Sequence, residues 1–303
     1  MYILFNGLPY FGNKIANDLR QSDSGHRFRY FNTYYSFLDK IAFLLHLPFA
    51  DLVVSMNGVS DPSAALDKVL FFKKKLVLFW QGTDVMLAME RFQHKTINRK
   101  YIDYSYNICD TDWLIQELKS CEITCEKVDY KWLTIHSANR KFEQLSVFSY
   151  LPTDKEVFYG WEIIQKLAKE FPSIPFYVAG SKGAGLEIPS NVNFLGWINS
   201  TQMQEQYQQH PIFIRLTAHD GYSLAVMEAL AHGAEVLWSM PHQQCFQVNS
   251  IEQARSAMEK AVAAIQSRTY KPNKENMEFI RLTMNREIVL KNLIAKLTAY
   301  AKQ

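Results

Sequence analysis

The sequence IFIRLTAHDGYSLAVMEALAHGAEVLW, residues Ile212–Trp238, decides the fold of this chain. Its first and last segments are short apolar runs, which are typical of buried β-strands. Between them lies a helical pattern with Ser223 at the N-cap position and Gly233 at the C-cap. The stretch therefore predicts a strand, a helix and a second, parallel strand.

The same alternation of apolar runs and helical patterns continues along the whole chain. It predicts an α/β protein with parallel sheets and helices on both of their faces. In the first half, strands are expected at Tyr2–Phe5, Arg27–Phe31, Asp51–Ser55, Leu76–Trp80, Tyr104–Cys109 and Ile123–Lys127, and helices at Gly12–Leu19, Phe37–Leu47, Ala64–Phe72 and Asp112–Leu118. In the second half, strands are expected at Leu145–Tyr150, Pro175–Ala179, Ile212–Leu216 and Glu235–Trp238, and helices at Tyr159–Glu170, Thr201–Gln208, Ser223–Ala231, Ile251–Gln266 and Lys274–Lys302.

Two domains are expected, because the chain has 303 residues and the pattern restarts near residue 144. The polar segment Tyr130–Phe142 has no clear strand, so the predicted Rossmann-like domains are residues 1–134 and 135–303. The last helix, residues 286–303, is a candidate to pack back on the first domain. Since ligands of open parallel sheets bind beyond the carboxyl ends of the strands, we expect a cleft between the domains to hold the substrates.

Composition excludes several classes of protein. Apolar residues make up 48% of the chain and the net charge is only +3, so no nucleic-acid partner is expected. No apolar run reaches about 18 residues and the first residues do not resemble a signal peptide, so a cytoplasmic protein is expected. A location at the inner face of a membrane is compatible with these features. The cysteines have no metal-ligand spacing and are expected to be reduced: Cys109, Cys121, Cys125 and Cys245.

The turn before the predicted helix carries the chemistry. Gly221 lets the backbone approach a ligand, and the N–H groups near Tyr222, Ser223 and Leu224, at the expected start of the helix, favour a diphosphate. Asp220 precedes the helix and Glu228 lies inside it. One carboxylate can serve a sugar while the other accepts hydrogen bonds from ribose hydroxyls.

These residues resemble a known family. The segment D-G-Y-S-L-A-V-M-E-A-L-A-H-G, residues 220–233, is similar to the donor-binding element E-G-x-x-x-x-x-x-E-A-x-A-x-G of retaining GT-B glycosyltransferases of family 4 (glycosyl transferases group 1). It departs from that pattern at the first position, where Asp220 replaces Glu. The resemblance implies that Asp220 contacts the donor sugar, Glu228 the ribose, and the Tyr222–Leu224 backbone the phosphates.

The resemblance also implies a function. It implies two Rossmann-like domains facing each other across a cleft, the first on the acceptor side and the second for the donor. The reaction would transfer a sugar, with retention, from a nucleoside diphosphate sugar to a saccharide or lipid-linked acceptor in surface polysaccharide or glycolipid biosynthesis. Because the protein itself clamps the phosphates in this fold, no metal and no further cofactor is required. Peripheral association with a membrane is compatible with this function.

Two further segments of the second half extend the resemblance. NFLGWI, residues 193–198, is similar to the strand and turn beside the nucleotide base, which implies base contacts from Gly196, Trp197 and Ile198. FSYLPTDKEVFYG, residues 148–160, is similar to the first loop of the donor domain. That likeness assigns Lys155 to the phosphates. The family's Arg is missing from this loop, and Lys182 or Arg215 is a candidate to replace it.

One segment of the first half completes the predicted site. FWQGTDV, residues 79–85, resembles the turn H-x-G-T-D-V of related enzymes, without its His. This implies acceptor or sugar contacts from Gln81, Thr83 and Asp84. Asp84 joins Asp220 and the adjacent His219 as the predicted catalytic residues.

Simpler interpretations stand beside these. Asp220 could only cap its helix, and Glu228 could be an ordinary helix residue. Asp110-Thr111-Asp112 mimics a D-x-D metal motif, but it follows a strand and precedes a helix, so an N-cap is the simpler account. At the level of function, the alternatives are a catalytically silent homologue that binds a nucleotide sugar or a partner, and a GT-B nucleotide-sugar epimerase.

Overall fold

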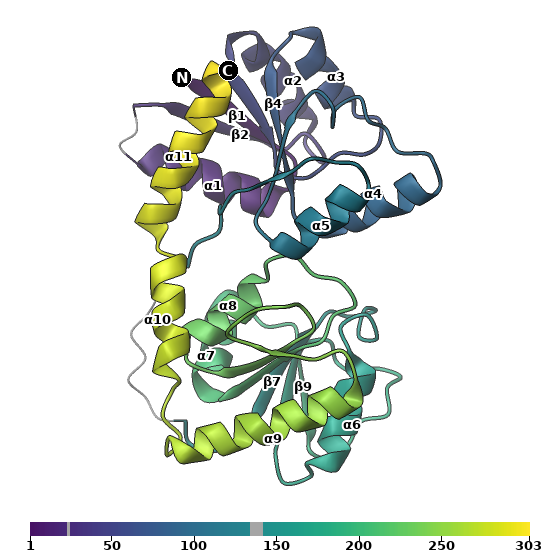
Figure 1. Ribbon diagram of the computed structural model, residues 1–303, viewed down its shortest axis with the longest axis vertical. Helices are drawn as coiled ribbons and strands as arrows, with labels where there is room; N and C mark the ends of the chain where they lie inside the picture. The colour runs from purple at the N-terminus through teal and green to yellow at the C-terminus, as the bar shows by residue number, and fades with distance from the viewer. Residues whose placement is uncertain (23–24, 134–141) are drawn as a thin grey trace. The chain divides into compact units, whose positions relative to one another are not determined.

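The chain forms two compact units, shown in a computed structural model that describes residues 1–22, 25–133 and 142–303 (Figure 1). Unit 1 contains Met1–Trp132 together with Arg286–Gln303, and unit 2 contains Leu133–Asn285. Most of the segment 130–142, where the domain boundary was expected, lies outside the described residues. Among the described residues, no helix is long and apolar enough to cross a membrane.

Unit 1 is built on a six-stranded parallel sheet in the order β2-β1-β3-β4-β5-β6. Its central strands are almost wholly apolar and buried, as expected for a sheet covered on both faces. The strands are β1 (Tyr2–Asn6), β2 (Arg27–Phe31), β3 (Leu52–Ser55), β4 (Lys75–Trp80), β5 (Tyr106–Cys109) and β6 (Glu126–Lys127).

Helices cover both faces of this sheet. One apolar cluster joins the sheet to α2, α3, α4 and α5, and a second joins it to α1 and α11 (Figure 1). The helices are α1 (Pro9–Gln21), α2 (Phe37–His46), α3 (Ala64–Phe71), α4 (Thr83–Gln93), α5 (Asp112–Ser120) and α11 (Arg286–Lys302), with a 3-10 turn at Leu47–Phe49.

Unit 2 repeats this architecture with the strand order β12-β11-β10-β7-β8-β9, again all parallel. Its strands are β7 (Val147–Leu151), β8 (Phe176–Gly180), β9 (Val192–Gly196), β10 (Ile212–Arg215), β11 (Glu235–Trp238) and β12 (Phe246–Gln247). Its helices are α6 (Trp161–Glu170), α7 (Ser200–Gln209), α8 (Leu224–Ala231), α9 (Ile251–Ser267) and α10 (Lys274–Thr283).

The predicted α/β class with parallel sheets is confirmed, and several elements differ from the prediction, among them the short strand β12, which was not expected. Helix α4 was not expected, because its start at Thr83 was interpreted as part of a turn. Helix α1 begins at Pro9 rather than Gly12, since proline is well suited to the first helical position. The single helical pattern expected at 274–302 is two helices, because α10 buries Ile280 in unit 2 while α11 buries its apolar residues in unit 1.

In each sheet, successive strands are first added on one side of the starting strand and then on its other side, which creates one reversal point. In unit 1 this point lies between β1 and β3, and in unit 2 it lies between β7 and β10. The loops that follow the two central strands leave in opposite directions there and open a crevice at the carboxyl edge of the sheet. Ligands of open α/β sheets bind at such points, so each unit has one place where a site is expected.

Candidate functional site

The reversal point of unit 2 joins two loops, one after β7 and one after β10. The N–H group of Ala218 donates a hydrogen bond of 2.8 Å to the carbonyl of Phe158, which links them. Gly160 has a φ of +85°, and a Cβ added to it would come within 2.5 Å of the Leu216 carbonyl oxygen. Glycine is therefore required at this close approach. The two loops place Lys155 and the 216–223 turn at the same edge of the sheet.

Helix α8 begins in the second of these loops. The hydroxyl of Ser223 accepts a hydrogen bond of 3.5 Å from the N–H group of Val226, so the predicted N-cap is confirmed. The N–H groups of Leu224 and Ala225 have no acceptor within the helix, because helix geometry leaves the first turn unpaired. They and the helix dipole give this helix start a positive partial charge. Ser223 is buried, while Tyr222 and Leu224 are half-buried.

Asp220 is held in place by two side chains. Its carboxylate accepts hydrogen bonds of 2.5 Å and 3.1 Å from the Nε and Nη2 atoms of Arg215, and one of 3.3 Å from the indole N–H of Trp238. The guanidinium and carboxylate are only 11% and 13% exposed, so the ion pair is largely shielded from water. Burial opposes the charge of Arg215, but the Asp220 carboxylate outweighs it and raises the pKa of the guanidinium.

Glu228 lies one turn inside α8 and is half-buried. Burial raises the pKa of the neighbouring Tyr207 hydroxyl well above its usual range, and the charge of Glu228 raises it further. The carboxylate of Glu228 therefore lies close to a buried phenol on α7. A contact with ribose stays a prediction.

His219 lies in a turn that Thr217 stabilises. The Thr217 hydroxyl accepts a hydrogen bond of 3.1 Å from the His219 N–H group and donates one to the His219 carbonyl. Both bonds use the backbone of His219. They fix the path of the chain just before Asp220, while the imidazole is half-buried beside it.

The ends of β8 and β9 lie next to each other at the same edge of the sheet. The N–H group of Gly196 donates a hydrogen bond of 3.1 Å to the carbonyl of Ser181, and a Cβ on Gly196 would lie 3.5 Å from the Lys182 side chain. Trp197 is 78% exposed and Ile198 is half-buried. Their predicted contact with a nucleotide base needs an accessible residue, and Trp197 meets that condition.

The basic residues at this edge differ in their availability. Lys155 is exposed, and its backbone closes a turn with Pro152 and Tyr159 through hydrogen bonds of 3.1 Å and 3.0 Å. Arg215 is already committed to Asp220 through two hydrogen bonds. Lys155 and Lys182 therefore fit the phosphate role better than Arg215 does.

Asp84 lies in unit 1, in the first turn of α4, and its carboxylate binds backbone N–H groups. Its carboxylate accepts hydrogen bonds of 2.6 Å from the N–H group of Gly58, 2.9 Å from Gln81, 2.8 Å from Gly82 and 2.9 Å from Val85. Both oxygens are used in this way. The geometry supports a role in shaping the turn, and a contact between Asp84 and a substrate stays a prediction.

The D-x-D segment is structural. The Thr111 hydroxyl caps α5 by accepting a hydrogen bond of 3.4 Å from Leu114, which confirms the N-cap interpretation. Asp110 forms a buried ion pair of 2.8 Å with Lys131. No group of three metal-ligating side chains occurs among residues 1–22, 25–133 and 142–303.

The contact between Trp238 and Asp220 was not predicted from the sequence, although a signal for it existed. Arg215 and Trp238 are the last residues of β10 and β11, and the register pairs them directly. Parallel strands that end together bring their final side chains to the same edge of the sheet. Knowing only the order of the strands would have placed Trp238 beside the site.

No protein-family model and no curated protein matches this sequence. Solved structures do match its fold. A sucrose-phosphate synthase from Thermosynechococcus elongatus has a TM-score of 0.70 at 10% identity, with 99% of each chain covered. An α-glucosyltransferase in complex with UDP and a 13-mer DNA has a TM-score of 0.67 at 9% identity, with 98% of this chain and 99% of the other covered.

The chain has the GT-B fold. A pneumococcal O-GlcNAc transferase, GtfA, in complex with UDP and GlcNAc also matches, with a TM-score of 0.59 at 12% identity. That match covers 86% of this chain but 60% of GtfA, so the chain spans less than two thirds of that enzyme. At these identities the similarity concerns the fold of the chain.

Proposed function

We propose that this GT-B chain is a glycosyltransferase that uses a nucleoside diphosphate sugar as donor. The observation that carries the proposal is the start of α8, whose first N–H groups have no acceptor within the helix, at the reversal point of the unit 2 sheet. The similar structures of the α-glucosyltransferase and of GtfA both contain UDP, which supports a uridine diphosphate donor. Unit 2 is then the donor unit, and unit 1 is the acceptor side.

Each residue of the site has a role in this proposal. The N–H groups of the 222–224 backbone and the Lys155 ammonium stabilise the charge that develops on the leaving diphosphate. Glu228 accepts hydrogen bonds from the ribose, and Trp197 lies against the base. With preorganised donors around the phosphates, the reaction needs no metal.

Transfer with retention is part of this proposal. As the glycosidic bond breaks, the sugar gains oxocarbenium character. The acceptor hydroxyl attacks from the side of the leaving group and passes its proton to the departing phosphate. His219 and Asp220, in the turn after β10, border the sugar.

The acceptor is a saccharide or a lipid-linked molecule, in the synthesis of surface polysaccharide or glycolipid. The transfer takes place in the cytoplasm. The absence of a nucleic-acid partner remains a prediction, although one similar structure contains DNA.

Calorimetry with UDP tests the donor site. We expect binding of UDP by the wild-type chain, and a Kd at least about tenfold higher for Glu228→Gln, because a lost hydrogen bond to a charged group weakens binding by about 1.5 kcal/mol or more. Glu259→Gln, on the exposed side of α9, is the matched control and should bind as the wild type does. No UDP binding by the wild-type chain would contradict the proposal.

One observation favours a second candidate, a catalytically silent homologue. Both oxygens of Asp220 are bound by Arg215, which leaves less of this carboxylate for a sugar. Incubation with a panel of nucleoside diphosphate sugars separates the candidates. Release of nucleoside diphosphate supports the transferase, binding without release supports the silent homologue, and a changed donor sugar without release supports the epimerase.

A further inference from the structure

Helix α2 exposes an apolar face to solvent. A surface helix normally directs its apolar residues to the core and its polar residues to water. In α2 the core receives mainly Phe43, whereas Phe37 is 74% exposed and Leu38 is 76% exposed. Positions 37, 41, 44 and 45 follow helical spacing and therefore share one side of the helix. The exposed apolar residues of α2 are Phe37, Leu38, Ile41, Leu44 and Leu45.

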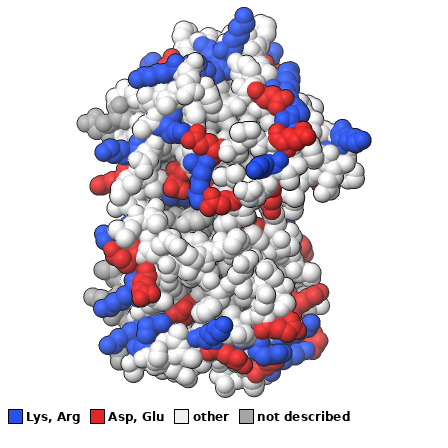
Figure 2. Space-filling view, viewed as in Figure 1, with Lys and Arg blue, Asp and Glu red and all other residues white. Residues whose placement is uncertain are grey.

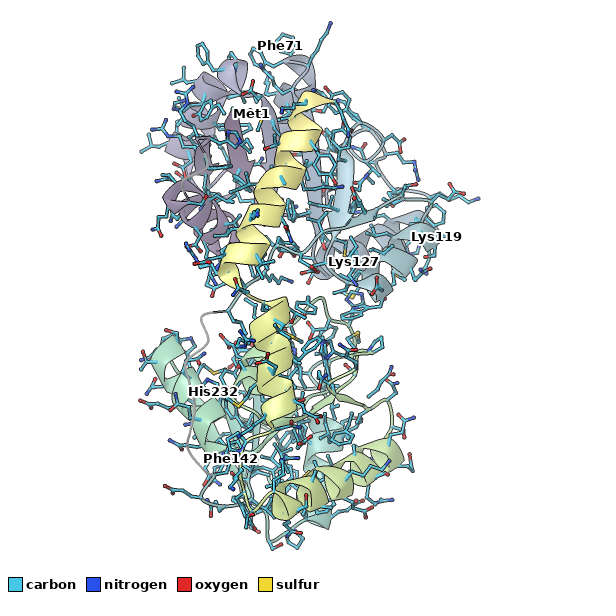
Figure 3. The ribbon with its side chains drawn as sticks, turned by 60° about the vertical axis from the view of Figure 1, so that its left-hand side comes forward. Met1, Phe71, Lys119, Lys127, Phe142 and His232 are labelled. Atoms are coloured by element: carbon cyan, nitrogen blue, oxygen red, sulfur yellow. The ribbon has the colours of Figure 1, made fainter. Side chains whose placement is uncertain are left out.

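This face continues beyond α2. The exposed Phe49 follows it in the 3-10 turn, and the exposed Phe71 ends α3. The ammonium of Lys74 donates a hydrogen bond of 2.7 Å to the carbonyl of Pro48, which ties the segment after α3 to that turn. Figure 3 shows Phe71 at the surface of unit 1. We call α2, Phe49 and Phe71 together the α2 face.

Basic residues outnumber acidic ones in the stretch that contains the α2 face, by seven to four between positions 26 and 75. Lys40, Lys68 and Lys73 are exposed beside it, and Lys68 lies 6.0 Å from the centre of the Phe71 ring. Figure 2 shows Lys and Arg side chains interspersed with Asp and Glu on the visible side of unit 1. The acidic residues between positions 26 and 75 are all engaged by other groups: Asp39 by Asn32, Asp51 by Tyr2, Asp61 by Arg91, and Asp67 by Lys100 and Tyr101.

A pocket of about 430 Å³ opens beside the α2 face, at the reversal point of the unit 1 sheet. Lys40 and Lys68 line it together with Leu44. Asn6, at the end of β1, also lines it and is 3% exposed, and its Oδ1 atom has no hydrogen-bond partner among the described residues. A buried acceptor of this kind calls for a donor from a ligand, such as a hydroxyl group.

We propose that the α2 face docks on an anionic lipid bilayer, with a phosphate-bearing headgroup in the pocket between Lys40 and Lys68. Apolar side chains that enter the acyl boundary, flanked by lysines that meet lipid phosphates, are the usual composition of an interfacial helix. A twofold dimer through this face would bring lysines toward their own copies, which disfavours self-association. Only the further step, that a lipid in the pocket is the acceptor, rests on the proposed function.

Co-sedimentation of the full chain with vesicles tests the docking. We expect binding to vesicles of phosphatidylcholine with phosphatidylglycerol to exceed binding to phosphatidylcholine alone by about tenfold, and to fall at high salt. Leu38→Ser/Leu45→Ser should weaken binding at least about tenfold, because two apolar side chains no longer leave water. The matched control is Val157→Ser/Leu282→Ser, at two exposed apolar positions of unit 2, and it should bind as the wild type does.

A second pair of variants tests the headgroup. Lys40→Gln/Lys68→Gln should lower binding to the anionic vesicles about tenfold and leave binding to the neutral ones unchanged. Lys119→Gln/Lys260→Gln, at exposed lysines elsewhere, is its control. Equal melting temperatures by circular dichroism show that each variant is folded.

Four results would overturn or separate the proposals. No binding of the wild type to anionic vesicles overturns the docking, and so does a dimer that Leu38→Ser/Leu45→Ser converts to a monomer in light scattering without any vesicle binding. UDP binding that persists while vesicle binding is absent rejects the docking alone. Vesicle binding without UDP binding rejects the proposed function alone.

Discussion

At the scale of single residues, the ion pair of Asp220 and Arg215 connects stability with the candidate site. Asp220→Ala would leave the buried guanidinium without its counter-charge, so we expect the free energy of unfolding of unit 2 to fall by about 3 kcal/mol. The apolar double variant Arg215→Met/Asp220→Leu should recover most of this loss, because it removes both charges together. Urea unfolding of the three chains measures the differences.

This pair also decides how activity data on Asp220 are interpreted. A loss of activity in Asp220→Ala alone could reflect the unpaired Arg215. If the double variant is stable and binds UDP but releases no nucleoside diphosphate from a nucleotide sugar, the pair of Arg215 and Asp220 takes part in the reaction beyond its effect on stability. If the double variant remains as unstable as Asp220→Ala, the ion pair is not the cause of the destabilisation.

His210 predicts a dependence of stability on pH. It is buried between Phe148 and Tyr177, and burial lowers its pKa to about 4 from 6.5. Below pH 6.5 the unfolded chain binds this proton first, so stability falls as the pH drops from about 6.5 to about 4 and no further below that. The full decrease in the free energy of unfolding is about 3 kcal/mol. The wild type should therefore lose that much more than His210→Gln between pH 7 and pH 4, as measured by urea unfolding.

His94→Gln is the control for this experiment. His94 is exposed at the end of α4, and its replacement should leave the pH dependence of the wild type in place. An equal acid loss in His210→Gln and the wild type would show that other titratable groups cause it.

At this scale, the sequence predicted a residue's role when its interactions are with the neighbouring backbone. Ser223 and Gly233 act locally, as a helix cap and a left-handed residue with a φ of +75°, and both were predicted. The partners of Asp220 come from the ends of two strands, and a pattern along one chain does not reveal which strands are neighbours. Local chemistry was therefore predictable, and the contacts that set the charge of the site were not.

At the scale of elements, the turn before α4 depends on one carboxylate. Gly82 has a φ of +149°, which allows successive N–H groups to converge on Asp84. In Asp84→Asn an amide donor would replace one acceptor oxygen and oppose the N–H group of Gly58. We expect unit 1 to lose about 2 kcal/mol or more of stability, measured by thermal and urea unfolding.

The control is Asp103→Asn. Asp103 pairs with Arg99 at an exposed position, and such pairs contribute about 1 kcal/mol at most. A stable Asp84→Asn variant that has lost activity would instead favour the predicted contact of Asp84 with a substrate.

The same turn explains why α4 was missing from the prediction. Resemblance to a known turn drew attention to FWQGTDV, while the helical pattern that follows it has only a modest apolar side, with Val85 and Ala88 buried. The buried strands were predicted closely because each is almost wholly apolar. An element that is apolar all along its length is easier to locate than one whose burial depends on its neighbours.

At the scale of the whole molecule, the two units differ in how the chain builds them. Unit 2 is one continuous segment, Leu133–Asn285, whereas unit 1 needs Met1–Trp132 and the distant helix α11. The restart of the strand pattern revealed both sheets from the sequence. The return of α11 could be named only as a candidate, because helical periodicity shows that one side is apolar and does not show which sheet receives it.

This difference predicts how fragments behave. Helix α11 buries Val289, Leu290, Leu293 and Leu297 against the sheet of unit 1. Each such side chain contributes about 1.5–3 kcal/mol, so together they approach the whole stability of a small domain. A chain ending at residue 285 should therefore lose the cooperative unfolding of unit 1.

A fragment of residues 133–285 should unfold cooperatively in urea and bind UDP with a Kd near that of the full chain, because its sheet and its candidate site are complete. Removing only Lys302 and Gln303, which are both exposed, is the control and should change neither transition. A chain without α11 that keeps both transitions would show that the helix merely covers a sheet already stable on its own.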